Sequence, residues 1–370
     1  FLILTSCYIL KKTNFTYYSY KVIKIQKITK SKIESVNFDN LVFGKTFTDH
    51  MFICHYKNNE WLTPEIRPYQ PLTLDPSASV LHYGQAVFEG MKAFKDSQEK
   101  IWLFRPDQNF ERINRSAHRL QIPEFPRKYF FDGIKKLVKL EQAWIKKGEG
   151  NSLYIRPFVF ASQPTVQASA SDEYIFMIIC APVSTYYSGG DINVLIAEEY
   201  SRAANGGVGF AKAAGNYAAQ FYPTSEALKK GFQQIIWTDA NNHEYLEEAG
   251  TMNIFFKIND SLITAPTNDR ILDGVTRKSI IEIAKSNGIK VEERPIKVSE
   301  IIEAHKTGNL QEIFGTGTAV VVLPIKSFSY RGVSYKTNGI DELAIALKKQ
   351  LIGIQYNQIE DLFNWTVKVD

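Results

Sequence analysis

Residues 206–217 have the sequence Gly-Gly-Val-Gly-Phe-Ala-Lys-Ala-Ala-Gly-Asn-Tyr, which places Lys212 between glycines. Glycines on both sides allow sharp backbone turns and a close approach to a flat ligand, and the small alanines leave space beside the lysine stem. An amine in such a pocket is a candidate Schiff-base nucleophile. A glycine-rich run is a weak signal by itself, so this stretch alone favours a lysine in a solvated loop.

The chain has 370 residues and a net charge of +5. This length is too great for one ordinary core and predicts two domains. Basic and acidic residues alternate through most of the sequence, which argues against a nucleic-acid surface. No Cys/His cluster has zinc spacing, so we expect no metal site.

Residues 1–34 combine an apolar start with basic and aromatic residues, and no initiator Met precedes them. The apolar stretch is too short to span a bilayer, and the features of a secretory signal are missing. We expect this segment to be an extension, a reading-frame artefact or a disordered tail outside the fold. A membrane-tethered binding protein is the rival hypothesis from another class. Three widely separated cysteines favour a cytoplasmic setting.

Strand and helix patterns alternate on both sides of a connector rich in Pro, Ser and Gly, residues 181–190. We therefore predict a mixed α/β chain with a small amino-terminal domain, residues 35–180, and a larger domain, residues 191–370. Strands are expected at His50–Tyr56 and Tyr174–Cys180, and an amphipathic helix at Gly133–Lys147.

Two later turns are suited to a phosphate. Asp273-Gly274-Val275-Thr276 opens a predicted helix with Asp273 as a candidate cap, and Gly315-Thr316-Gly317-Thr318-Ala319 follows a short strand. Backbone donors at such turns can cradle an anion, although each turn taken singly is more often structural. Neither turn matches a nucleotide-binding motif.

A lysine, two phosphate turns and an acid have one chemical explanation in common. Pyridoxal phosphate needs an amine for its aldehyde, an anchor for its phosphate and a carboxylate that keeps its ring nitrogen protonated. Glu248, in Glu248-Ala249-Gly250-Thr251-Met252-Asn253-Ile254-Phe255, supplies the carboxylate. The sequence therefore predicts a pyridoxal-phosphate site.

Four motifs together resemble the branched-chain amino-acid aminotransferases, pyridoxal-phosphate enzymes of fold type IV. They are residues 206–217, residues 248–255, residues 315–319 and Leu81-His82-Tyr83-Gly84-Gln85-Ala86-Val87-Phe88-Glu89-Gly90-Met91-Lys92-Ala93-Phe94. They occur in the order of the family, from about Phe43 to Tyr356. Several long motifs in order are far more specific than any one of them, and they disfavour the solvated-loop interpretation of Lys212. The resemblance implies a cofactor held between a small and a larger α/β domain.

The resemblance also implies residue roles. Lys212 would carry the Schiff base and act as catalytic base, and Glu248 would pair with the ring nitrogen. The other implied cofactor contacts are Tyr217, Arg105, Arg202, Val275, Thr276 and Thr318. The implied substrate contacts are Phe88, Tyr83, Tyr154, Arg156, Tyr186, Thr251 and Ala319.

The implied activity is reversible transamination of L-leucine, L-isoleucine and L-valine with 2-oxoglutarate, by a homodimer without membrane or nucleic-acid partners. Two enzymes of the same fold type remain alternatives, D-amino-acid aminotransferase and aminodeoxychorismate lyase. The long match around Phe88 and the run Gly250–Asn253 favour the branched-chain enzyme. Some family members carry a Cys-x-x-Cys pair where this chain has Val320-Val321-Val322-Leu323, which excludes a thiol switch at that position.

Overall fold

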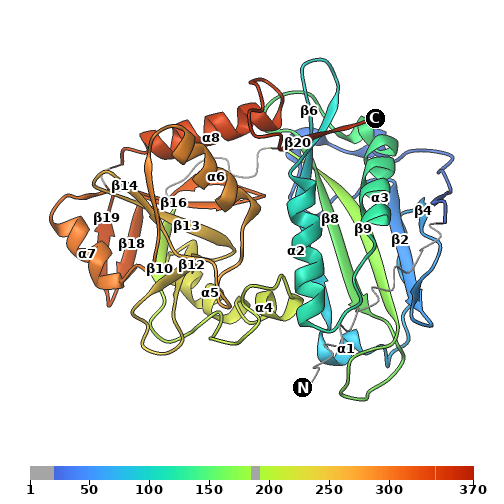
Figure 1. Cartoon of the computed structure of the whole chain (residues 1–370), viewed down its shortest axis with the longest axis horizontal. Helices are drawn as coiled ribbons and strands as arrows, with labels where there is room; N and C mark the ends of the chain where they lie inside the picture. The colour runs from blue at the N-terminus through green and yellow to red at the C-terminus, as the bar shows by residue number, and fades with distance from the viewer. Residues whose placement is uncertain (1–20, 185–191, 338) are drawn as a thin grey trace, which may run out of the picture.

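The computed structural model of the chain describes residues 21–184, 192–337 and 339–370. Two ten-stranded sheets lie side by side, and helix α2 (Pro106–Arg119) lies between them at the centre of Figure 1. Pro106 at the first helical position starts this helix, because a proline ring is already set for the helical backbone and no hydrogen bond is lost.

The first sheet has the order β1-β4-β2-β9-β8-β6-β7-β20, with β3 beside β2 and β5 beside β8. Its long central pair, β8 and β9, is antiparallel in register from Ser152 opposite Val183 to Ala161 opposite Tyr174. The strands of this sheet are β1 (Lys24–Ile25), β2 (His50–Lys57), β3 (Glu60–Trp61), β4 (Glu65–Pro68), β5 (Ala86–Phe88), β6 (Met91–Lys95), β7 (Ile101–Phe104), β8 (Ser152–Ala161), β9 (Tyr174–Val183) and β20 (Thr366–Val369).

The second sheet has the order β15-β14-β13-β12-β11-β10-β18-β19, and β16 pairs with both β13 and β17. Parallel pairs, such as β10 with β11, occur beside antiparallel ones. The strands of this sheet are β10 (Asn193–Ile196), β11 (Gln234–Thr238), β12 (Leu246–Ala249), β13 (Met252–Ile258), β14 (Ser261–Thr264), β15 (Lys290–Glu293), β16 (Leu310–Gly317), β17 (Val321–Pro324), β18 (Ser327–Tyr330) and β19 (Val333–Lys336).

Helices cover the sheets and join their strands. Short 3-10 turns lie at Ile33–Ser35, Phe38–Asn40 and Gln142–Trp144. The remaining α-helices are α1 (Val80–Tyr83), α3 (Arg127–Leu140), α4 (Ala214–Ala218), α5 (Phe221–Lys229), α6 (Val275–Ser286), α7 (Val298–Lys306) and α8 (Glu342–Gln355).

Strand β13 shows why the second sheet is buried on both faces. Met252, Ile254, Phe256 and Ile258 pack into one apolar cluster with residues of α7, whereas Phe255 packs into another with residues of α6 and α8. Successive side chains of a strand point to opposite faces, so a continuous apolar run is needed where helices cover both faces.

The prediction that residues 1–34 lie outside the fold is wrong for residues 21–34. β1 pairs in parallel with β4, and Ile23 is buried in the core of the first sheet. A side-chain hydrogen bond also attaches this segment to the fold: Ser31 Oγ donates to Asp49 Oδ2 at 2.5 Å. The basic composition concealed a short edge strand.

The predicted boundaries at residues 35–180 and 191–370 stay predictions, and two features bear on them. β9 continues to Val183, into the predicted connector, whose later part lies outside the described residues. The last strand, β20, leaves the second half of the chain and pairs with β7 of the first sheet. The first sheet is therefore not built from one continuous segment, whereas the strands of the second sheet follow one another in the chain from β10 to β19.

The helix predicted at Gly133–Lys147 is misplaced. α3 runs from Arg127 to Leu140, after Pro126 as its N-cap. The basic residues of its first turn obscured the start of the helix in the sequence. The buried residues of α3 begin at Tyr129 and Phe130.

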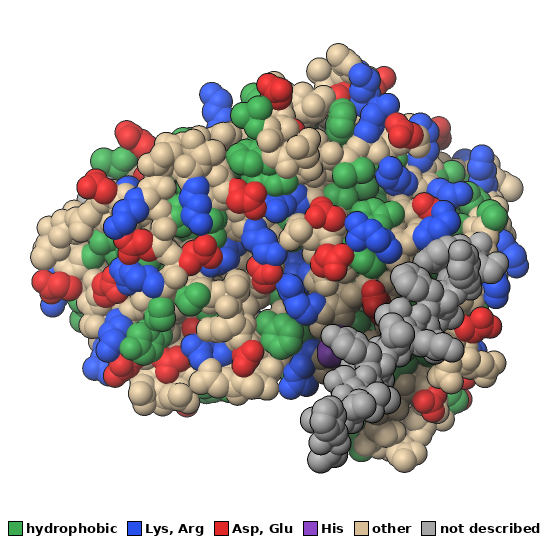
Figure 2. All heavy atoms as spheres, viewed as in Figure 1, with side chains coloured by type: hydrophobic (Ala, Val, Ile, Leu, Met, Phe, Trp, Pro, Cys, Tyr) green, Lys and Arg blue, Asp and Glu red, His purple; other side chains and the backbone are tan. Residues whose placement is uncertain are grey.

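Charges on the surface are mixed, as Figure 2 shows for one face. Among the helices of the described ranges, none is long and apolar enough to cross a bilayer. Cys54 and Cys180 are free and buried, and burial raises the pKa of the Cys54 thiol to about 12.

We predict that Gly133→Ala destabilises the fold, since a Cβ at this position would lie 2.7 Å from Phe52 Cε2. Overpacking of a core costs roughly 1–3 kcal/mol, and the better helix propensity of alanine offsets about 1 kcal/mol. Urea denaturation should show a net loss. Gly215→Ala is the control, because a Cβ there meets nothing within 4 Å; equal effects of the two changes would contradict the packing argument.

Candidate active site

Lys212 lies where the two halves of the chain meet. Its Nζ donates to the Tyr217 hydroxyl at 2.6 Å and lies 4.5 Å from the centre of the Phe88 ring. The backbone carbonyl of Lys212 accepts from Phe88 N at 3.1 Å, which joins this loop to β5 of the first sheet. The half-buried amine is thus held between two aromatic rings rather than in a solvated loop.

The Phe88 ring contacts a second cation besides Lys212. The Arg156 guanidinium lies 4.6 Å from the centre of the Phe88 ring, and Arg156 Nη2 donates to the Tyr154 hydroxyl at 2.9 Å. The Arg156 Nε is buried without a hydrogen-bond partner. Four of the predicted residues around Lys212 are therefore in one group: Tyr217, Phe88, Tyr154 and Arg156.

Glu248 lies on β12 in a fully enclosed position, and Arg202 Nη2 contacts its Oε2 at 2.6 Å. Its Oε1 accepts from Asn253 Nδ2 at 3.1 Å and from Leu272 N at 3.0 Å. Burial raises the pKa of Glu248 above its ordinary value, against the opposing effects of Arg202 and Lys212. An additional positive group beside this carboxylate would favour its ionised form.

One of the loop glycines, Gly209, has a packing role, and the predicted clearance for a flat ring stays a prediction. A Cβ on Gly209 would lie 2.6 Å from the Arg270 carbonyl oxygen, and the Gly209 carbonyl accepts from Arg202 Nη2 at 3.0 Å. Gly209 therefore allows two backbone segments to approach each other and helps to hold Arg202 against Glu248.

The amino terminus of α6 forms a cradle. Val275, Thr276 and Thr318 line one small cavity, together with Asn109 and Lys92. The predicted cap Asp273 is wrong: Gly274 is the N-cap, no side chain caps the helix, and Asp273 instead pairs with Arg115 and Lys278. The first amides of an uncapped helix remain donors for an anion.

Arg105 is not brought to this cradle. Its Nη1 donates to Ser279 Oγ and Glu282 Oε1, both at 3.1 Å, and its guanidinium stacks on Trp365. Its partners belong to α6 beyond the first turn and to the segment before β20.

Arg112 is the residue that sequence reasoning missed. Its Nη1 donates to the Asp273 carbonyl at 3.0 Å, two residues before α6, and its guanidinium forms two contacts with Glu89, at 2.6 and 2.8 Å. Asn109, Arg112 and Ser116 lie on one buried face of α2, and Ser116 Oγ accepts from Lys212 N at 2.9 Å. Polar residues at i, i+3 and i+7 on the apolar side of a helix were the available signal.

Comparison with known proteins identifies the family. The amino-transferase class IV family matches residues 86–328. Branched-chain-amino-acid aminotransferase 2 of Bacillus subtilis strain 168 is 43% identical over 348 residues, 93% of this chain and 96% of that protein. The probable branched-chain-amino-acid aminotransferase of Staphylococcus epidermidis strain RP62A is 43% identical over 353 residues, 94% of this chain and 98% of that protein. The chain belongs to the class IV aminotransferases. The predicted family is confirmed.

Solved structures share the fold of this aminotransferase. The branched-chain aminotransferase from Thermoproteus uzoniensis with norvaline has a TM-score of 0.71 at 23% identity, with 87% of this chain and 100% of that chain covered. The Escherichia coli branched-chain enzyme has a TM-score of 0.67 at 23% identity, with 87% and 99% covered. These matches confirm the predicted mixed α/β fold of type IV.

Of the other four predicted substrate contacts of the aminotransferase, three lie outside the group around Lys212 and one lies outside the described residues. Thr251 is exposed in the turn between β12 and β13, and Ala319 is half-buried in the loop between β16 and β17. Tyr83 is 47% exposed on α1 and donates to the Val166 carbonyl, so its contacts include none of the Lys212 group. Tyr186 lies outside the described residues.

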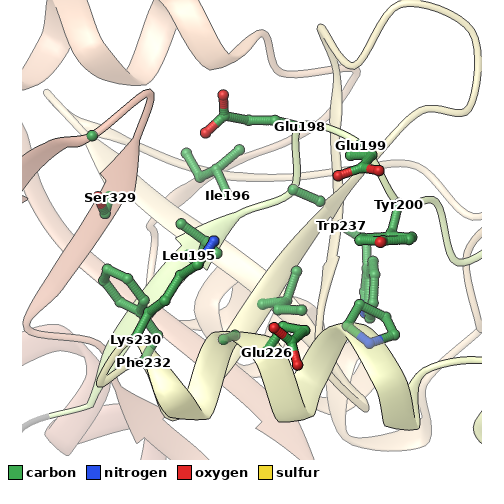
Figure 3. Close-up of a pocket in the computed structure, with 15 residues that line it drawn as sticks. Leu195, Ile196, Glu198, Glu199, Tyr200, Glu226, Lys230, Phe232, Trp237 and Ser329 are labelled. Atoms are coloured by element: carbon green, nitrogen blue, oxygen red, sulfur yellow. The ribbon is translucent and has the colours of Figure 1, made fainter.

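A cavity of about 480 Å³ lies away from these residues, between α5 and the ends of β10 and β11. Figure 3 shows Glu198, Glu199 and Glu226 around it, over apolar residues that include Leu195 and Trp237. None of the predicted site residues lines it. In the described ranges no group of three or more His, Cys, Asp or Glu could hold a metal ion.

We predict that Glu89→Gln is strongly destabilising, because Glu89 and Arg112 are both buried and the change leaves the arginine without a counter-charge. Breaking one side of a buried pair costs about 3–5 kcal/mol. Denaturation near neutral pH tests this. The control is Glu111→Gln, which removes the exposed pair with Arg127 and should cost about 1 kcal/mol or less.

The effect should depend on pH in a defined direction. Burial alone would raise the pKa of Glu89, but Arg112 and its hydrogen bonds lower it below the ordinary value of 4.5. The pair therefore stabilises the fold above pH 4.5, and its contribution is lost as pH falls below that value. A difference between wild type and variant that grows in acid would contradict this assignment.

Proposed function

We propose that this chain is a branched-chain-amino-acid transaminase that uses pyridoxal phosphate on Lys212. The observation that carries the proposal is the grouping of three features: the Lys212 amine on Tyr217, the buried Glu248 and the uncapped α6 terminus. The last two connect to the segment Leu272–Gly274, and Lys212 is joined to it through α2, whose Ser116 accepts from Lys212 N. The ends of this segment contact Glu248 and begin α6, and the Asp273 carbonyl contacts Arg112.

The residues present fit this cofactor. Thr276 supplies a hydroxyl and the first turn of α6 supplies amides for the phosphate, and Thr318 lines the same cavity while its hydroxyl donates to the Gly90 carbonyl. Arg112, rather than Arg105, is the arginine that we assign to this end, because it contacts the residue that precedes the helix N-cap. When bound, pyridoxal phosphate supplies an aldehyde for amines and a protonated ring that withdraws electrons from a carbanion.

The chain's own groups then have separate tasks. Lys212 Nζ takes up the proton from the Cα of the substrate and would deliver it to the aldehyde carbon of the cofactor, while the Tyr217 hydroxyl orients the amine. Glu248, with Arg202 on its Oε2, would pair with the ring N–H of the cofactor and hold that proton in place. Enclosure of Glu248 excludes water that would compete for the same contact.

The substrate side combines aromatic surface with one cation. Phe88 and Tyr154 offer apolar walls to leucine, isoleucine and valine side chains, and Arg156 offers its guanidinium to the distal carboxylate of glutamate or 2-oxoglutarate. Both half-reactions would therefore use one space. A D-amino-acid aminotransferase or aminodeoxychorismate lyase is the alternative, and a spectrophotometric panel with L-leucine, D-alanine and aminodeoxychorismate separates the three.

We also propose a homodimer, in which Tyr83 of one copy closes the site of the other. The support is its exposure together with that of Leu81, 60% exposed, and Val166, 63% exposed. Sedimentation of the purified protein tests this. For the compartment, the free thiols of Cys54 and Cys180 support a cytoplasmic location.

We predict that Lys212→Ala abolishes transamination and also the near-visible absorbance of the bound cofactor, because the alanine has no amine to bond to the aldehyde. Lys229→Ala, an exposed lysine on α5, is the control and should leave both unchanged. An active Lys212→Ala protein with intact absorbance would overturn the proposed function.

We predict that Glu248→Gln keeps the cofactor but lowers kcat by about 10²-fold or more, since a neutral amide cannot hold the ring proton. Cofactor content by absorbance and steady-state rates with L-leucine measure the two effects separately. Rates close to wild type in a fully loaded variant would exclude this role for Glu248.

A further inference from the structure

Lys92 is a buried cation outside the Lys212 group. It lies on β6, is 8% exposed and donates from Nζ to the Ala319 carbonyl at 3.1 Å. Ala319 belongs to the loop between β16 and β17, so this hydrogen bond joins the first sheet to the second. Lys92 lines the cradle cavity together with Thr318. It also lines a second cavity together with Ala319, Val320 and Val321, and this second one is the shared cavity.

A second hydrogen bond makes the same connection. Thr318 Oγ1 donates to the Gly90 carbonyl at 3.1 Å, two residues before Lys92. Gly90 in turn lies against the substrate side, because a Cβ there would lie 2.2 Å from the Tyr154 hydroxyl. The segment Gly90–Lys92 therefore contacts both the loop and the aromatic wall.

The loop is strained, which indicates that its shape is imposed by these contacts. Val321 has a φ of 62°, a left-handed conformation that is unfavourable for a β-branched residue. Such outliers persist only where the surrounding structure holds them. Because the peptide unit is planar, fixing the Ala319 carbonyl on Lys92 also fixes the direction of the Val320 N–H, a donor of the kind that binds carboxylates.

We propose that Lys92 is a positioning residue that holds the loop Thr318–Val321 in place and thereby sets the affinity of the site for branched carboxylates. The inference rests on the proposed function, since it takes Ala319 and Thr318 as parts of the substrate and cofactor space. Lys92 acts through the loop and is not itself a catalytic residue.

The charge on Lys92 changes within an accessible pH range. Burial, and then Lys348 on α8, lowers its pKa to about 8. The other titratable groups around the shared cavity are Glu149, in the loop before β8, and Tyr356, after α8. Burial raises the pKa of Tyr356 to about 12, so Tyr356 stays neutral where Lys92 titrates. Above about pH 8 the ammonium becomes an amine, which is a weaker donor to the Ala319 carbonyl.

The test measures binding of 4-methylvalerate to the cofactor-loaded protein, because this branched carboxylate has no amino group and keeps one charge from about pH 7 to about pH 9.5. For Lys92→Met we expect a Kd about tenfold higher than wild type at about pH 7, as for loss of a charge-assisted hydrogen bond. At about pH 9.5 the ratio should fall to about 2 or less, because the wild-type lysine has also lost its proton.

Two further variants sharpen the test. Lys95→Met is the matched control, since Lys95 lies on the same strand and donates to the Gln142 carbonyl, away from the loop; its Kd should equal wild type at both pH values. Lys348→Met removes the neighbouring like charge and should raise the pKa of Lys92. The affinity of this variant should therefore fall at a higher pH than that of the wild type. This variant tests the proposal even if Lys92→Met does not fold.

A ratio that stays constant with pH, a Lys92→Met affinity equal to wild type, or an unshifted transition in Lys348→Met would overturn the proposal. Each measurement begins with the absorbance of the loaded protein. Absence of that absorbance in the wild type would count against the proposed function, whereas a loaded protein without the pH-dependent ratio would count against Lys92 alone.

Discussion

The buried ion pair between Glu89 and Arg112 is the interaction on which the site depends. Glu89 follows β5 and Arg112 lies on α2, and the pair is completed by Asn109 and by the Asp273 carbonyl. Burying either charge without its partner would be too costly, so the pairing fixes the positions of both side chains. Through these contacts α2 holds β5, the Lys212 loop and the start of α6 in one geometry.

The same arrangement explains why α2 is polar on its inner face. An ordinary surface helix turns apolar residues inward, and α2 does so with Phe110 and Ile113. Asn109, Arg112 and Ser116 interrupt that face because their partners are a carboxylate, backbone carbonyls and the Lys212 amide. The helix thus serves as packing for one sheet and as the polar wall of the site for both.

The sequence was most informative where a function needs a local pattern. Lys212 and Glu248 were found from glycine framing and an acid before a strand, and the structure brings both to the same region. The resemblance implies Arg105, in the Phe-Arg-Pro start of α2, and does not point to Arg112. Which arginine faces inward depends on the rotation of the helix about its axis and on Glu89. Glu89 and Arg112 are far apart in the sequence, and only the fold brings them into contact. The position of Tyr83 and the role of Gly209 likewise depend on contacts between distant segments.

The return of the last strand to the first sheet has a consequence for how this chain is made. β20 pairs with β7, so Val369 lies opposite Ile101, and the first sheet is completed only by a strand that follows the whole second sheet in the chain. During synthesis β7 therefore waits with an open edge until the whole second sheet has emerged from the ribosome. Long-range pairing of this kind slows folding and exposes a strand to association with other chains. The β7 edge is consequently open to such association for as long as the second sheet is being synthesised.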